Sequence, residues 1–192
     1  MSRPLPAFTV ASLLFAFLPA ALRGQAAATP PKDSIQADRD FVRKQAAENL
    51  LEVQLGQLAQ RHATNPTVQK FGQNMALDHQ KLEKQWTDLA KKHGMRIKPA
   101  LTSVEQGKIT RLQQTGRPDF DRAYMITMIK GHTKDAADLK AAVDSARSEP
   151  VRKMAAYALP IVQDHLRNAE RTGKEIGVDS TAVARSHVAA NE

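Results

Sequence analysis

The sequence predicts an all-α protein, an antiparallel four-helix bundle, from three observations. Only 5% of the 192 residues are aromatic, which favours helices over a β-sandwich, where aromatic and β-branched residues are preferred. Apolar residues recur at intervals of three and four in long stretches. Proline and glycine separate these stretches. With 42% hydrophobic residues, the chain can form one domain with one core but is too short for two substantial domains.

The first segment predicts export. Arg3 supplies positive charge near the start, and residues 7–22 are uncharged and mostly apolar. We therefore predict a signal peptide over 1–26 and a linker over 27–32, which places the mature protein in the periplasm or cell envelope of a bacterium. An uncleaved membrane anchor is the alternative, although the apolar run is short for a spanning helix. The mature chain contains no other stretch of spanning length.

Composition also restricts the chemistry and the partners. The chain has no cysteine, which excludes a lipoprotein anchor, structural disulfides and thiol catalysis. Removing Arg3 and Arg23 with the signal peptide lowers the formal charge from +8 to +6, because no acidic residue precedes Asp33. Such a basic exported protein can attract anionic envelope components or associate with itself. An ordinary solvated surface is the alternative, and we expect no nucleic-acid partner.

The first predicted hairpin contains two long helices. Residues 33–63 form the first, because Gly56 is their only glycine and they contain no proline. Asn65 then provides an N-cap before Pro66, and the second helix continues to His93, where Gly94 ends it. The second helix has the most regular apolar stripe in the chain, formed by Val68, Phe71, Met75, His79, Leu82, Trp86 and Leu89.

A long connection leads to the second hairpin. The capping box from Thr102 to Glu105 predicts a short helix within residues 95–118, and Gly116 ends that helix. The third long helix begins near Pro118 or Asp119. Ser148-Glu149-Pro150 ends it and starts the fourth long helix. The folded domain is thus predicted over 33–177, followed by a flexible tail over 178–192. Two hairpins with one long connection are the layout of ferritin-like bundles.

Four ionisable residues, one per long helix, are predicted to meet at the centre of the bundle. Glu52 lies 13 residues before Asn65 and His79 lies 14 after it, while His132 lies 17 before Glu149 and His165 lies 16 after it. At about 1.5 Å per residue, the partners in each antiparallel hairpin have nearly the same height. The three histidines also fall within apolar stripes, which is uncommon for this residue.

One carboxylate and three imidazoles are a competent ligand set for one transition-metal ion: zinc, iron, copper or manganese. Glu48 and Asp135 lie within one helical turn of Glu52 and His132, where they could support the ligands or join them. The alternative is a hydrogen-bonded polar core network without metal, which would fix the helix register.

The pattern of a di-iron oxidase is absent from the sequence. That pattern requires Glu-x-x-His on two helices, whereas Ala76 and Val162 occupy the positions three residues before His79 and His165. No nucleophilic triad, phosphate-binding loop or dinucleotide motif occurs either. The sequence therefore favours a non-enzymatic role, and an enzyme would additionally need an open metal position and a substrate channel.

The chain resembles a large bacterial family of exported proteins that is catalogued as a domain of unknown function, assigned to the ferritin-like superfamily and often labelled as outer membrane proteins. The resemblance covers about 33–177 and rests on four motifs in order: Ala47-Glu48-Asn49-Leu50-Leu51-Glu52-Val53-Gln54-Leu55-Gly56, Met75-Ala76-Leu77-Asp78-His79, Phe120-Asp121-Arg122-Ala123-Tyr124 with Gly131-His132, and Leu159-Pro160 with His165. It implies a helical bundle in the envelope. Two functions stay open: metal handling or stress protection, and a non-catalytic structural or interaction role.

Overall fold

The computed structural model describes residues 32–178 and residue 183, and every regular element within these residues is a helix. The prediction of an all-α protein is therefore confirmed. The predicted signal peptide over 1–26, nearly all of the linker and most of the tail lie outside the described residues. In chain order the helices are α1 (Lys32–His62), α2 (Pro66–Lys92), the short α3 (Ser103–Gln114), α4 (Arg117–Ser145) and α5 (Glu149–Glu175).

Local signals in the sequence set the limits of these helices. The Asn65 side chain accepts a hydrogen bond of 2.8 Å from the Thr67 amide, and Pro66 opens α2. After α2, Gly94 has a φ of +66°, a left-handed conformation that glycine adopts without steric cost. Thr102 and Glu105 form the predicted capping box of α3. The predicted helix limits therefore agree with the structure to within one or two residues.

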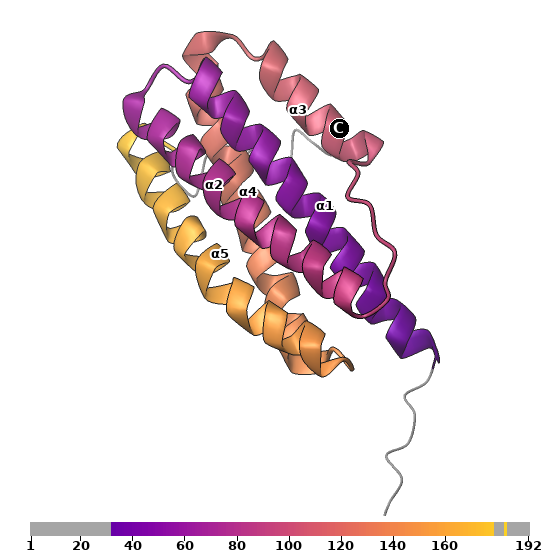
Figure 1. Cartoon of the computed structure of the whole chain (residues 1–192). Coiled ribbons are helices and arrows are strands. Elements are labelled where there is room, and N and C mark those ends of the chain that lie inside the picture. The colour runs from indigo at the N-terminus through magenta and orange to yellow at the C-terminus, as the bar shows by residue number, and fades with distance from the viewer. Residues whose placement is uncertain (1–31, 179–182, 184–192) are drawn as a thin grey trace, which may run out of the picture.

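The helices form two antiparallel hairpins, α1 with α2 and α4 with α5 (Figure 1). Glycine allows the closest approach in the first hairpin: a Cβ atom on Gly56 would lie 2.5 Å from the main-chain oxygen of Gly72. The connection that contains α3 passes beside α1 and returns the chain to the end where α2 begins (Figure 1). Helices α2 and α4 consequently run in the same direction.

Each hairpin is capped by an aspartate of the other hairpin. Asp121 of α4 accepts hydrogen bonds from the main-chain amides of Thr64 and Asn65, in the turn between α1 and α2. Asp38 of α1 accepts from the amides of Arg147 and Ser148, in the turn between α4 and α5. These reciprocal caps hold the first helices of the two hairpins antiparallel, and they satisfy amides at the start of α2 and α5.

A polar layer divides the hydrophobic core into two clusters. One cluster, near the turn between α1 and α2, includes Leu55, Phe71 and Tyr124. The other, near the turn between α4 and α5, includes Trp86 and Leu139. The buried polar residues of the intervening layer are Asn49, Glu52, His79, His132, Asp135 and His165. The core thus places its ionisable side chains together near the middle of the long helices.

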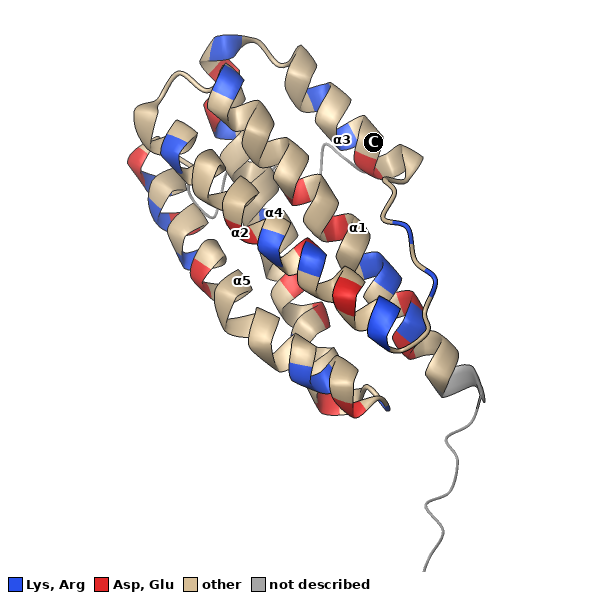
Figure 2. Ribbon diagram, viewed as in Figure 1, with Lys and Arg blue, Asp and Glu red and all other residues tan. Residues whose placement is uncertain are grey.

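The outer surface carries both signs of charge. Lysine and arginine are interspersed with aspartate and glutamate along the helices (Figure 2). Among the described residues, no helix combines the length and the apolar character needed to cross a membrane.

Candidate metal site

Three histidines from three helices converge in the polar layer. His79 of α2, His132 of α4 and His165 of α5 are each at most 4% exposed. The Nε2 atom of His79 lies 3.3 Å from Nε2 of His132 and 3.2 Å from Nδ1 of His165. One ring nitrogen of each histidine therefore faces a common centre, and all three of these atoms lie within 4.8 Å of one another.

The opposite nitrogen of each ring faces an oxygen atom. His79 Nδ1 lies 2.9 Å from Oδ1 of Asn49, and His132 Nδ1 lies 2.9 Å from the main-chain oxygen of Met128. His165 Nε2 lies 3.4 Å from Oδ2 of Asp78. The Asn49 amide is oriented by its own Nδ2, which donates to the main-chain oxygen of Gln45 at 2.8 Å. Each outer nitrogen therefore has an acceptor and must carry the ring proton to donate to it.

These contacts favour one tautomer of each ring. A neutral imidazole carries one N–H, and in all three rings that hydrogen is directed outward. The three inner nitrogens consequently present lone pairs to one another, and none has a hydrogen to donate. A purely protein network would leave these lone pairs unpaired, whereas a cation at the centre would accept all three. The outer oxygens have the arrangement that orients metal-binding histidines in proteins.

The histidines are held neutral, as metal ligands must be. Burial lowers the pKa of His79 well below its usual value, and His132 and His165 lower it further. Burial likewise lowers the pKa of His132, against the opposing effect of its hydrogen bond to Met128. Burial and the neighbouring His132 lower the pKa of His165 to about 4. All three rings are therefore unprotonated at neutral pH.

The separation of the inner nitrogens suits a metal ion of ordinary size. Two nitrogens bound at about 2.0–2.1 Å with a tetrahedral angle lie about 3.3–3.4 Å apart. The two closest separations in the cluster, 3.2 and 3.3 Å, match this distance. Two of the three separations therefore suit a tetrahedral ion, and the third pair of nitrogens lies within 4.8 Å.

The predicted carboxylate ligands lie beside the histidines. Glu52 is 8% exposed, and its Oε1 atom lies 3.4 Å from the position that a Cβ atom on Gly131 would occupy. Glu52 is not part of the group whose ligand atoms lie within 4.8 Å of one another. Glu48 and Asp135 form a separate group with Asp138. The structure therefore brings the three predicted histidines together and places the predicted carboxylates along the neighbouring α1–α4 contact.

Comparison with known families adds a classification. A family model described as a domain of unknown function (DUF4142) matches residues 21–172. The chain belongs to this family. The resemblance inferred from the sequence motifs is thereby confirmed, while no curated protein matches the chain.

The fold of this DUF4142 domain is similar to that of a solved structure, a DUF305 fragment from Deinococcus radiodurans. The TM-score is 0.65 and the sequence identity is 13%, and the match covers 77% of this chain and 99% of the fragment. At this identity the similarity establishes a shared fold and no shared activity.

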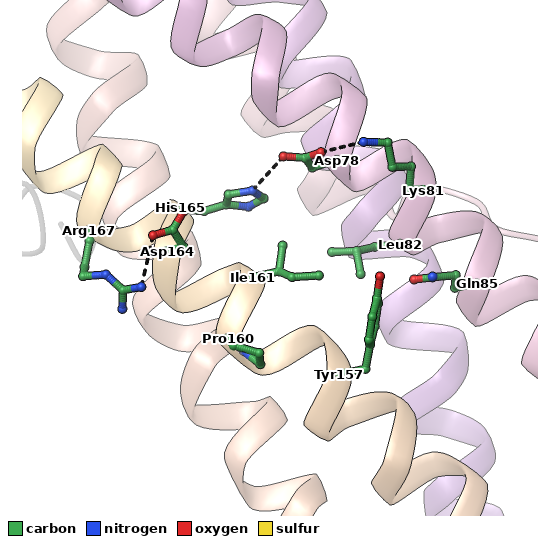
Figure 3. Close-up of a pocket in the computed structure, with 10 residues that line it drawn as sticks. All are labelled: Asp78, Lys81, Leu82, Gln85, Tyr157, Pro160, Ile161, Asp164, His165 and Arg167. Atoms are coloured by element: carbon green, nitrogen blue, oxygen red, sulfur yellow. Dashed lines mark hydrogen bonds and ion pairs between the residues drawn. The ribbon is translucent and has the colours of Figure 1, made fainter.

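A groove between α2 and α5 reaches one histidine of the cluster in the DUF4142 domain, His165. A pocket of about 540 Å³ is lined by Asp78, Tyr157, Asp164 and His165, among others, and Figure 3 shows the Asp78 carboxylate between Lys81 and the His165 ring. A second pocket of about 250 Å³ also reaches Asp78, Asp164 and His165. His165 is therefore the member of the cluster that borders both pockets, beside the carboxylates of Asp78 and Asp164.

Two residues that orient the histidines were missed by the sequence analysis. Asp78 and Asn49 appear in the sequence analysis only as members of the family motifs, without a role of their own. The signal for Asn49 exists, since Asn49 and His79 each lie 15 residues from Thr64, the centre of the observed turn. Counting from Thr64 rather than Asn65 would have paired these two residues.

Proposed function

We propose that this protein is an exported four-helix bundle of the ferritin-like type that binds one transition-metal ion in the periplasm or cell envelope. The ligands are His79, His132 and His165. The observation that carries the proposal is the orientation of the three rings, whose outer hydrogens are all engaged by oxygen atoms. The inner lone pairs then need a cation rather than another hydrogen-bond partner.

Three neutral imidazoles favour ions of borderline softness, such as zinc, copper or iron. Manganese, which prefers oxygen ligands, suits this cluster less well. The metal would leave one coordination position for water or an external ligand, and the groove between α2 and α5 borders the cluster at His165. These properties support metal handling or protection against metal stress in the envelope as the role. A structural or interaction role without metal is the competing function, and metal content distinguishes the two.

The test is a zinc titration of the metal-free protein, followed by elemental analysis after dialysis. We expect one zinc ion per chain. His165→Ala removes one ligand at the accessible edge of the cluster and should weaken zinc binding at least a hundredfold. Asp78→Ala removes the acceptor of the outer His165 hydrogen, together with the surface ion pair to Lys81, so the expected loss is about 10- to 100-fold.

His93→Ala is the matched control, because His93 is an exposed histidine at the end of α2. It should bind zinc like the unchanged protein. Circular dichroism of each variant verifies that the helices are retained. Zinc binding that is absent in the unchanged protein, or equal in His165→Ala and His93→Ala, would show that the three histidines are a polar core network.

A further inference from the structure

A second group of ligating side chains lies on the other side of His132, where α1 packs against α4. Carboxylate oxygens of Glu48, Asp135 and Asp138 lie within 4.8 Å of one another. Gln45, which is 1% exposed, donates from Nε2 to Glu48 at 3.0 Å and to Asp135 at 3.1 Å. Like-charged groups are thus gathered at a largely buried contact between two helices.

Glu52 supplies an independent indication that a ligand is missing from this group. It lies one helical turn after Glu48, and its Oε2 atom is buried without a hydrogen-bond partner. Its Oε1 atom faces α4 at Gly131, one turn before Asp135. Asp135 is also the charged group that acts most strongly on Glu52. Glu52 therefore faces α4 one helical turn from the group formed by Glu48, Asp135 and Asp138, and it lies outside that group itself.

The charges of this contact do not balance. Lys44 lies 2.5 Å from Asp138 and 3.4 Å from Glu48, and Lys134 lies 2.6 Å from Asp138. Lys134 also lies 4.0 Å from Glu48, so both lysines lie closest to Asp138 and pair more distantly with Glu48. When ionised, the four carboxylates carry a formal charge of −4 against +2 from the two lysines, which leaves −2. An excess of two negative charges at a partly buried contact favours compensation by a cation or by protons.

The electrostatic surroundings of Glu48 and Glu52 favour the protonated form of both carboxyls. Burial and the charge of Asp135 raise the pKa of Glu52 to about 8, against a smaller opposing effect of Lys108. Burial and Asp135 also raise the pKa of Glu48 to about 8, although Lys44 and Lys134 oppose them. Without a cation, both carboxyls therefore retain protons near neutral pH.

We propose that the α1–α4 contact is a second cation site, in which Glu48, Asp135 and Asp138 bind one hard divalent ion. The unpartnered Glu52 carboxylate, one helical turn from Glu48, turns toward that ion and completes the site. Oxygen ligands suit magnesium, calcium and manganese, in contrast to the three imidazoles of the histidine cluster. The net charge of −2 matches one such ion. If the Gln45 amide turned over, its oxygen would replace the N–H donors and add a further ligand of the same type.

The experiment is a titration of the full, metal-free chain with Mn²⁺, with the free ion measured by electron paramagnetic resonance. We expect one bound Mn²⁺ per chain, displaced by excess Ca²⁺ because calcium accepts oxygen ligands. Glu52→Gln keeps the size of the side chain and removes its charge, so Mn²⁺ affinity should fall at least tenfold. Glu48→Gln should have the same effect and provides a second variant if one folds poorly.

Two controls separate this site from the histidine cluster. Glu170→Gln removes an exposed carboxylate of α5 and should leave Mn²⁺ binding unchanged. His165→Ala should also retain Mn²⁺ while losing zinc, so that failure of either site is detected separately. The proposal is overturned by no saturable Mn²⁺ binding, by equal affinity in the unchanged protein and both glutamine variants, or by Mn²⁺ binding that His165→Ala abolishes.

Discussion

The buried Glu52 carboxyl should make the stability of the metal-free protein depend on pH. Its pKa is about 8 in the folded chain against 4.5 for an ordinary glutamate. The folded state therefore binds the proton more tightly, and this stabilisation is present below pH 4.5 and is lost as the pH rises through 8. Each pH unit within that window corresponds to about 1.4 kcal/mol. Between pH 5 and pH 7 the loss is about 2–3 kcal/mol.

Glu52→Gln should lack this part of the pH dependence, because its amide does not titrate. Urea denaturation at pH 5, 6, 7 and 8 in the presence of a chelator measures the free energy of unfolding for both proteins. The unchanged protein should lose about 2–3 kcal/mol more than the variant between pH 5 and pH 7. Glu170→Gln, at an exposed position, should follow the unchanged protein. Parallel curves for the unchanged protein and Glu52→Gln would refute a buried, proton-bound Glu52.

Three further perturbations test other parts of the structure. The pKa of His165 is lowered from 6.5 to about 4. Its stabilising effect is therefore present above pH 6.5, and about 3 kcal/mol is lost as the pH falls through 4. The loss of stability in acid should be less steep in His165→Gln. Gly56→Ala and Gly72→Ala should each destabilise by about 1–3 kcal/mol in urea, because the added Cβ atoms would lie 2.5 and 2.6 Å from atoms of the neighbouring helix. Gly107→Ala in α3, whose Cβ would meet only the end of a flexible arginine, is their control and should be neutral or slightly stabilising. Asp121→Ala removes the acceptor of the turn between α1 and α2 and should lower the unfolding free energy by about 2 kcal/mol, whereas an unchanged urea midpoint would contradict a capping role.

The helices could be predicted because their limits depend on local chemistry. The N-cap at Asn65, the proline after it and the capping box at Thr102 act within a few residues of the helix starts that they specify. The path of the long connection could not be predicted in this way. Residues in the middle of a helix stay at the middle of the bundle whichever end α4 begins from. Counting residues therefore cannot predict the direction of α4. The hydrogen bonds from Asp38 and Asp121 show which ends meet.

For the candidate site, the position of each residue along its helix could be predicted, but the side of the helix that it faces could not. Counting residues along helices brought His79, His132 and His165 together, as they are in the structure. Glu52 differs because it follows Asn49 by three residues, which turns its side chain by about 300° around α1. Asn49 consequently contacts His79, while Glu52 faces α4 at Gly131. Rotation about a helix axis depends on how helices pack, and a residue count does not contain that information.

The reciprocal caps of Asp38 and Asp121 affect how the molecule unfolds. Neither hairpin contains the acceptor for the Asn65 or Ser148 amide of its own turn, since the other hairpin provides it. Separating the hairpins would release both turns at once, even though these turns lie at opposite ends of the long helices. The Asn65 and Ser148 amides should therefore exchange with deuterium at the same rate, in a single cooperative opening, rather than fraying independently as exposed loops do.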